Sequence, residues 1–343
     1  MSQEAEPMKP LVGPTPSDLE TGVALGANID AEPGETAAAT ALRREEAGAD
    51  YEVALESLNQ WQLAWRKFKH HRLALVGLVV LAILAGVAIV GPILWPFDFS
   101  TIPQPDQVVY QGRPPSLAHP FGETGGLQRD VLNLVINGSR TSLFIGFSAM
   151  ILGVIIGTIV GSLAGFVGGT IDNVLMRTVD VFLSIPLLFL ILVASRFFGN
   201  GNVVLIIVIF AFFSWMGIAR LVRSLFLSIR EREFVEAARA VGVRDRRIIF
   251  RHILPNAISP IVVSASLLVA SVIILEAFVS FLGFGVNPIY PTWGNILSNS
   301  LTFIPLGNWW WPFFPGFMII LTVLAVNFIG DGLRDALDPR TRA

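Results

Sequence analysis

The chain has 343 residues, of which 53% are hydrophobic and only 15% are charged, whereas soluble domains carry about 25% charged residues. This deficit indicates that lipid surrounds much of the folded chain. The formal net charge of −2 favours no nucleic-acid partner, and the absence of cysteine excludes disulfides, thiol catalysis and cysteine-ligated metal. The four histidines are scattered and form no metal-binding pattern.

The first 59 residues differ in composition from the rest of the chain. They are rich in Ala, Pro, Gly, Thr and acidic residues, and Tyr51 is their single aromatic residue. Such a segment cannot bury enough apolar surface to offset the loss of chain entropy. It also lacks the basic and apolar opening of a secretory signal. We predict a disordered, acidic tail over residues 1–59.

Six apolar segments are long enough to cross a bilayer, whose hydrocarbon core of about 30 Å requires roughly 20 helical residues. The sequence therefore predicts an all-α polytopic membrane protein with six transmembrane helices. These helices are expected at residues 73–94, 141–166, 174–193, 203–222, 260–282 and 312–329. The predicted organisation is a segment with the first helix (60–100), a loop (101–138), a five-helix core (139–334) and a short tail (335–343).

Basic residues gather on one side of this predicted bundle. They precede the first helix, are dense between the fourth and fifth helices, and follow the sixth. Because positively charged loops stay in the cytoplasm, both termini and the loop 220–257 are expected there. Residues 101–138 then form an extracytoplasmic loop. An interfacial tryptophan belt is expected on that outer side, formed by Trp293, Trp309, Trp310 and Trp311.

The second predicted span carries a stripe of small residues. Gly153, Gly157, Gly161 and Gly165 recur every fourth residue and so share one helix face. A glycine stripe lets another helix backbone approach closely. We predict tight helix packing along this face.

Three polar or helix-breaking positions lie within the predicted spans. Pro186 should kink or break the third helix, and a broken helix can line a path through the membrane. Glu276 and Asp180 are intramembrane acids, which are costly in lipid and often functional. For Glu276, a pair with a polar group of the bundle and an ion-coupling site are both open. Asp180 forms a cluster with Asp172 and Arg177 in the inner half of the third span.

The loop 220–257 predicts two short helices joined by a glycine. Residues 234–241 are good helix formers, and Glu236 and Arg239 have i,i+3 spacing. Gly242 is a natural helix stop, Asp245 can open a second helix, and Pro255 should end it. The adjacent small residues Ala237 and Ala238 would admit a partner closely, as a helix seated in a groove requires.

This loop resembles the EAA loop of permeases from binding-protein-dependent ABC importers. The resemblance rests on Glu236-Ala237-Ala238, then Gly242, then Leu254-Pro255. His252 replaces the usual Ile, as in the dipeptide and oligopeptide branch. Other segments resemble the second, C-type permease of the peptide and nickel group, from about residue 60 to residue 340: 119–122 (HPFG), 138–142 (GSRTS), 280–285 (SFLGFG), 291–294 (PTWG) and 330–339 (GDGLRDALDP). One departure is 124–130 (TGGLQRD), where the family usually has DExGRD.

The resemblance implies a type I importer fold in a prokaryotic plasma membrane and a set of partner subunits. These are two ABC ATPase subunits, a homologous second permease and an extracytoplasmic solute-binding protein, with peptides or a similar solute such as a nickel chelate as cargo. The sequence also shows no phosphate-binding Gly-x-x-x-x-Gly-Lys loop, because its lysines are Lys9, Lys67 and Lys69. ATP and Mg are therefore expected on the partner subunits, and transport would proceed by alternating access.

Two other interpretations of the chain remain open from its residues. The Arg-rich loop could simply bind anionic lipid headgroups, although that leaves its small residues and its Gly242 turn unexplained. The chain could instead be a secondary transporter or channel driven by an ion gradient, for which Glu276 is the only support. An intramembrane enzyme would need a catalytic pair within the membrane, and the sequence contains none.

Overall fold

A computed structural model describes residues 60–96, 111–126, 128–199 and 201–337. Within these ranges the chain is helical and contains no strand. The predicted tail 1–59, the segment 97–110 and the last six residues of the predicted tail 335–343 lie outside the described residues.

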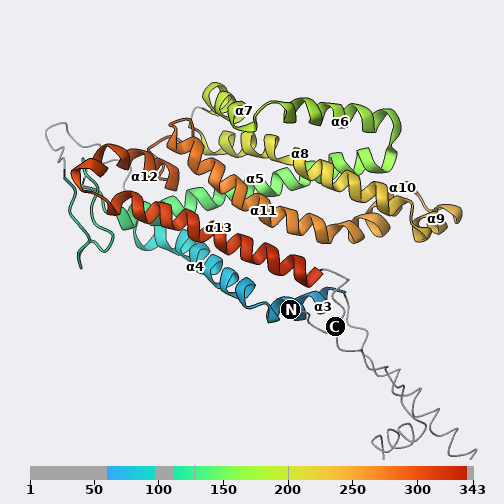
Figure 1. Ribbon diagram of the computed structural model, residues 1–343, viewed down its shortest axis with the longest axis horizontal. Coiled ribbons are helices and arrows are strands. Elements are labelled where there is room, and N and C mark those ends of the chain that lie inside the picture. Colours follow the sequence, from blue (N-terminus) through green and yellow to red (C-terminus); the bar gives the residue numbers. More distant parts are fainter. Residues whose placement is uncertain (1–59, 97–110, 127, 200, 338–343) are drawn as a thin grey trace, which may run out of the picture. The chain divides into compact units, whose positions relative to one another are not determined.

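Five long apolar helices and one broken helix form the bundle (Figure 1). After the amphipathic α3 (Gln60–His70), the helices with the length and hydropathy to span a membrane are α4 (Arg72–Leu94), α5 (Val131–Val167), α8 (Val203–Arg230), α11 (Leu254–Phe281) and α13 (Trp310–Leu337). The remaining candidate span, third in chain order, is a bent pair of helices. It consists of α6 (Gly169–Ser184), α7 (Leu187–Ala194) and the π-helical turn η2 (Ser195–Gly199). Six predicted apolar segments therefore correspond to five spans and one bent pair.

The break between α6 and α7 lies at Ile185 and Pro186. The helix axes before and after it differ by 86°. Ile185 is extended, with φ −95° and ψ 135°, because a proline restricts the preceding residue to this region. Pro186 also has no N–H to continue the ladder. The predicted interruption of the helix at Pro186 is therefore a full break rather than a gentle kink.

Helix α5 begins earlier than the sequence predicts. Residues 131–138 were expected in the outer loop, but Asp130 caps the helix by accepting from the backbone N–H groups of Leu132 (2.7 Å) and Asn133 (3.3 Å). Polar side chains make this first part look like a loop in sequence. They bond back along the helix instead, as when Ser139 Oγ donates to the Val135 carbonyl at 2.7 Å.

Helix α11 also departs from the prediction. Pro255 was expected to end the second loop helix, yet α10 (Asp245–Ile248) runs through a π-helical turn, η3 (Ile249–Ile253), directly into α11. The wider turn relieves the clash of the proline ring with the preceding turn, and Pro255 sits in the first turn of α11, where its missing N–H costs little. Residues 245–281 thus form one 37-residue helical unit.

The segment between α11 and α13 is structured rather than an open loop. It contains α12 (Trp293–Ser300) and a 3-10 helix, η4 (Leu301–Leu306). The predicted tryptophan belt is wrong for three of its four members. Trp293, Trp310 and Trp311 are buried because α12 and the start of α13 pack back on the bundle, and only Trp309 is exposed.

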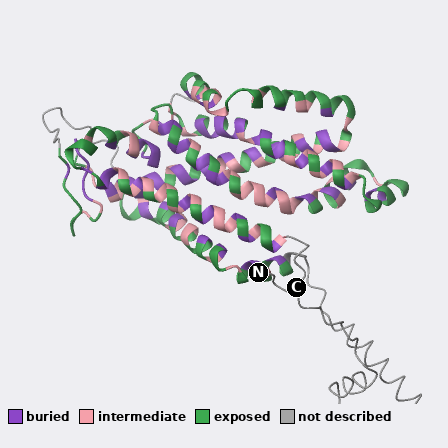
Figure 2. Ribbon diagram, in the orientation of Figure 1, coloured by how far each residue is buried: buried purple, intermediate pink, exposed green. Residues whose placement is uncertain are grey.

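Burial is uneven across the bundle. α5 and α8 share the most extensive helix contact, α4 pairs with α13, and α11 contacts both α5 and α13. By contrast, α6 is largely exposed (Figure 2), whereas most of α7 is half-buried and packs against the core cluster that contains Ile191. At the end of the bundle that carries α9 and α10 lie the α5–α6 turn and the end of α8, whereas α12 lies at the opposite end (Figure 1).

Candidate functional site: the α9–α10 loop and the helices behind it

The loop after α8 forms a short helix and a glycine turn, as its sequence predicts. α9 spans Glu233–Ala240. Gly242 follows with φ +77°, its N–H bonds the Arg239 carbonyl at 2.9 Å, and the Val243 N–H bonds the Ala238 carbonyl at 3.0 Å. These two bonds are those of a Schellman C-cap, which needs a left-handed residue at this position. No atom lies within 4 Å of a Cβ built on Gly242, so its requirement is conformational and not steric.

The two alanines of the loop have different environments. Ala237 is exposed, whereas Ala238 is buried with Val235 against the bundle. The expectation that both alanines admit a partner is therefore wrong for Ala238. Val235 and Ala238, three residues apart, lie on the face of α9 that packs against the bundle. The other side chains of α9 are exposed. Arg239 lies with its guanidinium 5.6 Å from the Phe166 ring centre instead of pairing with Glu236.

The remaining loop residues anchor the turn to two long helices. Ile248 and Ile253 are fully buried with Phe226 of α8 and Ala257 of α11. Beside them, His252 and Leu254 are half-buried and Pro255 is exposed. A cluster of this kind makes the loop move with α8 and α11, since packed interiors transmit displacement.

The exposed side of the loop is apolar and basic together. Phe234, Val241 and Phe250 are 41%, 80% and 68% exposed. The same loop carries the exposed side chains of Arg244, Arg246, Arg247 and Arg251. Apolar side chains surrounded by polar ones at a water-facing end of a bundle are typical of a protein docking surface.

The predicted glycine stripe lies against α8. A Cβ at Gly157 would stand 2.7 Å from the Trp215 carbonyl oxygen, one at Gly161 2.5 Å from the Ala219 carbonyl oxygen, and one at Gly165 2.8 Å from the Arg223 carbonyl oxygen. Gly153 is looser, with 3.3 Å to Ser214. The backbones of α5 and α8 are thus closely apposed over about three helical turns.

Glu276 is part of the packed interior. It is 1% exposed, and its carboxylate accepts hydrogen bonds from Ser142 Oγ of α5 (3.1 Å) and Ser280 Oγ of its own helix (2.8 Å). Ser142 Oγ also accepts from the Trp293 backbone N–H at 3.2 Å. Of the two interpretations left open by the sequence, this geometry is that of a carboxylate paired within the bundle, joining α5, α11 and α12.

Two ion pairs connect α6 with α8. Arg223 donates hydrogen bonds from Nε and Nη2 to the two carboxylate oxygens of Asp172, and the Nη2–Oδ2 distance is 2.6 Å. Arg220 forms an ion pair with Asp180. Both arginines were expected in the cytoplasmic loop 220–257, and neither pair was predicted. Neither helix shows these pairs by its own sequence pattern, because the partners lie 40 and 51 residues apart.

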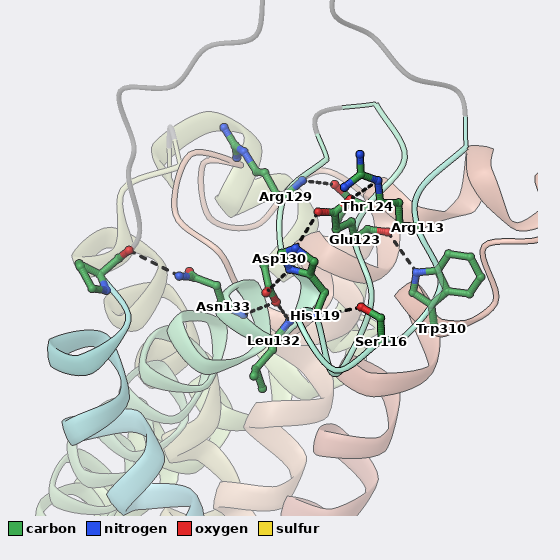
Figure 3. A network of polar contacts seen from close by, with 11 residues as sticks. Arg113, Ser116, His119, Glu123, Thr124, Arg129, Asp130, Leu132, Asn133 and Trp310 are labelled. Carbon is green, nitrogen blue, oxygen red and sulfur yellow. Dashed lines mark hydrogen bonds and ion pairs between the residues drawn. The ribbon is translucent and has the colours of Figure 1, made fainter.

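At the opposite end, a polar network fastens the segment 111–130 to the bundle (Figure 3). His119 lies between two carboxylates, with Nδ1 2.8 Å from Asp130 and Nε2 3.0 Å from Glu123. Arg113 approaches Glu123 at 3.6 Å, and Trp310 Nε1 donates to the Glu123 carbonyl at 3.0 Å. The HPFG segment noted in the sequence therefore positions the Asp130 cap of α5.

This arrangement of apolar helices is that of a multi-pass membrane protein whose surface loop is fixed to its spanning helices. Comparison with known proteins gives the family. Residues 136–343 match the model of the binding-protein-dependent transport system inner membrane component, and residues 59–115 match the N-terminal TM domain of oligopeptide transport permease C. The chain belongs to the family of binding-protein-dependent transport system inner membrane components.

Its relatives include peptide permeases. The dipeptide transport system permease protein DppC of Bacillus subtilis (strain 168) is 39% identical over 84% of this chain and 89% of its own. The oligopeptide transport system permease protein OppC of Escherichia coli (strain K12) is 41% identical over 84% of this chain and 94% of its own. A structure of the MetNI methionine ABC transporter in an inward-facing conformation shares the fold, with TM-score 0.50 and 22% identity over 60% of this chain and 96% of that chain.

Proposed function

We propose that this chain is a membrane permease subunit of an ATP-driven ABC importer that carries peptides delivered by an extracytoplasmic binding protein. The relatives at about 40% identity over most of the chain, which are named as dipeptide and oligopeptide permeases, carry this proposal. A nickel chelate remains the alternative cargo within the same proposal. The subunit is placed in the inner membrane of a prokaryote, with both termini and the α9–α10 loop in the cytoplasm.

The exposed side of the α9–α10 loop is the surface on which an ATPase subunit docks. Val241 stands at the tip of the turn and Phe250 on the π-helical turn, and both are apolar and open to solvent. The buried residues of the same loop pack on α8 and α11. A push on the turn is therefore delivered to two spanning helices, as coupling of ATP hydrolysis to helix movement requires.

The partner subunits supply ATP hydrolysis and the other half of the transport path. Two ABC ATPase subunits bind ATP and Mg and hydrolyse ATP, a homologous permease completes the path, and lipid covers the remaining apolar surface. No catalytic residue is assigned to this chain. The ATP state of the docked ATPase pair sets which side is open, because only a partner that binds the two conformations differently can shift their equilibrium.

Docking is tested with the variant Val241→Asp in the complex purified from membranes through a tag on this chain. A charge at the centre of an apolar contact is expected to lower the amount of co-purified ATPase about tenfold. The matched control is Leu117→Asp, since Leu117 is fully exposed at the opposite end of the bundle. ATPase retention that is equal in both variants would refute docking at this turn, and a wild-type complex without any ATPase would refute the importer itself.

The cargo is tested by uptake into proteoliposomes that contain the whole complex and its binding protein. ATP-dependent accumulation of a labelled dipeptide or oligopeptide is the expected result. Uptake of a nickel chelate without peptide uptake would replace the cargo and leave the importer intact. Uptake driven by an ion gradient in the absence of ATP would favour a secondary transporter.

A further inference from the structure

Helix α6 carries a polar stripe along its whole length. Asn173, Arg177, Asp180 and Ser184 follow one another at spacings of four, three and four residues, so they share one helix face. All four side chains are exposed. Beside this stripe, Val174 and Val181 form an apolar strip that is 59% and 63% exposed. The helix therefore presents two faces of opposite character to its surroundings.

The depth of this stripe excludes lipid as its neighbour. α6 has 16 residues, or about 24 Å at 1.5 Å per residue, which is most of the bilayer core of about 30 Å. Asp180 lies about 17 Å from the start of the helix, and the Asp180 and Arg220 side chains remain 47% and 49% exposed. Charged side chains at this depth face protein or water and not hydrocarbon.

Three of the four stripe residues, Asn173, Arg177 and Asp180, line a charged cavity between α6 and α8. Its volume is about 460 Å³, and it is lined by Asn173, Met176, Arg177, Asp180, Arg220 and Arg223. Arg220 is paired with Asp180 and Arg223 with Asp172. Arg177 has neither a hydrogen bond nor an ion pair to any residue that the structure describes. The lining thus holds three arginines and one aspartate, Asp180, and Asp172 pairs with Arg223 from outside the lining. Arg177 is therefore the one cation of this lining available to a ligand among the described residues.

We propose that the α6 stripe lines a water-filled section of the transport path, and that Arg177 binds the carboxylate of a peptide passing through it. The Asp180–Arg220 pair lies on the same cavity wall and offers the complementary anion to a peptide ammonium group. The cargo in this inference rests on the proposed function, whereas the water-filled stripe does not. A guanidinium suits this role because it keeps its charge and can grip a carboxylate with two N–H groups.

The water-filled stripe is tested by single cysteines, for which the natural chain offers a background without cysteine. Asn173→Cys and Ser184→Cys are compared with Val174→Cys and Val181→Cys in the assembled complex in lipid nanodiscs. The probe is a positively charged, membrane-impermeant methanethiosulfonate reagent. The stripe positions are expected to react at least tenfold faster than the valine positions, because a thiol in lipid meets neither the reagent nor water.

Equal and slow labelling of all four positions would overturn the proposal. Stripe positions that react in the isolated chain and are protected in the assembled complex would also overturn it, because the face would then be a contact between subunits. Neither result depends on transport. The labelling experiment can therefore refute the water-filled stripe without bearing on the proposed function. The proposed function is judged separately, by peptide uptake into proteoliposomes that contain the wild-type complex.

The role of Arg177 is tested by Arg177→Gln and Arg177→Lys in the complete complex with its binding protein. Loss of the charge is expected to lower peptide uptake about tenfold, the effect of losing one charge-assisted hydrogen bond. The lysine variant is expected to keep more of the uptake than the glutamine variant, since it keeps the cation but loses the paired N–H contact. Equal uptake by both variants, whether normal or impaired, would contradict a charge-based contact with the peptide.

Discussion

Helix α8 contacts its two neighbours, α5 and α6, in different ways. Towards α5 its backbone lies directly on a row of glycines, and side chains such as Phe226 and Val222 are fully buried. Towards α6 it extends Arg220 and Arg223 to two aspartates beside a charged cavity. One contact is dry and made of backbone and apolar atoms, whereas the other is polar and open to water.

The difference indicates which helices move together. Contact between backbones leaves no room for a second arrangement, because close-packed interiors resist displacement. The Asp180–Arg220 pair, whose side chains are 47% and 49% exposed, can exchange its partners for water at little cost, whereas Asp172 of the other pair is only 12% exposed. We infer that α5 and α8 move as one body with the α9–α10 loop, and that α6 can shift against them. The break at Pro186 gives α6 a further point of freedom relative to α7.

The largest effect is expected from Gly161→Leu in the dry contact. A Cβ at this position would already lie 2.5 Å from the Ala219 carbonyl oxygen and 2.7 Å from Val222 Cβ, so the helices must separate. We expect a loss of about 3 kcal/mol in the free energy of unfolding, measured as the melting temperature of the detergent-solubilised protein. The matched control is Gly217→Ala on α8, where no atom lies within 4 Å of the new Cβ. Similar melting temperatures for both variants would show that the contact is not close-packed.

A smaller effect is expected when the two ion pairs of the polar contact are broken one at a time. Asp172→Asn leaves Arg223 beside a side chain that is only 12% exposed, and should cost about 1–3 kcal/mol. Asp180→Asn breaks a pair whose side chains are half exposed, and should cost about 0–1 kcal/mol. The two melting temperatures measure this order directly. A larger loss for Asp180→Asn would mean that the cavity is dry and the contrast between the two contacts is wrong.

The course of the chain could be predicted because hydropathy determines where helices cross a membrane. The glycine period in 153–165 and the break at Pro186 were also readable, since both act through the backbone of their own helix. Helix ends were not, because they depend on caps and on partners. α5 starts at Val131 on account of the Asp130 cap, and α11 continues through Pro255 because a π-helical turn precedes it.

The polar side chains were the least predictable part. Arg220 and Arg223 were counted as loop bases because no local pattern shows that the aspartates of α6, about 40 to 50 residues earlier, lie opposite them. Trp293 was expected at the membrane surface, yet it is buried because α12 packs back on the bundle. In both cases the outcome depends on contacts between helices far apart in sequence, which periodicity within one helix does not encode.

A modest effect on stability, but a large one on function, is expected at the Gly242 turn of the α9–α10 loop. Gly242→Ala introduces no clash but holds a side chain at φ +77°, which costs about 1–2 kcal/mol. If the loop drives α5 and α8 as one body, loosening this turn should separate ATP hydrolysis from peptide uptake while the complex remains assembled. The measurement is the number of peptides imported per ATP hydrolysed in proteoliposomes. Gly86→Ala on α4, where no atom lies within 4 Å of the new Cβ, is the control. An unchanged ratio in the Gly242 variant would mean that the turn does not transmit the movement, and the contact through Ile248 and Ile253 would have to carry it alone.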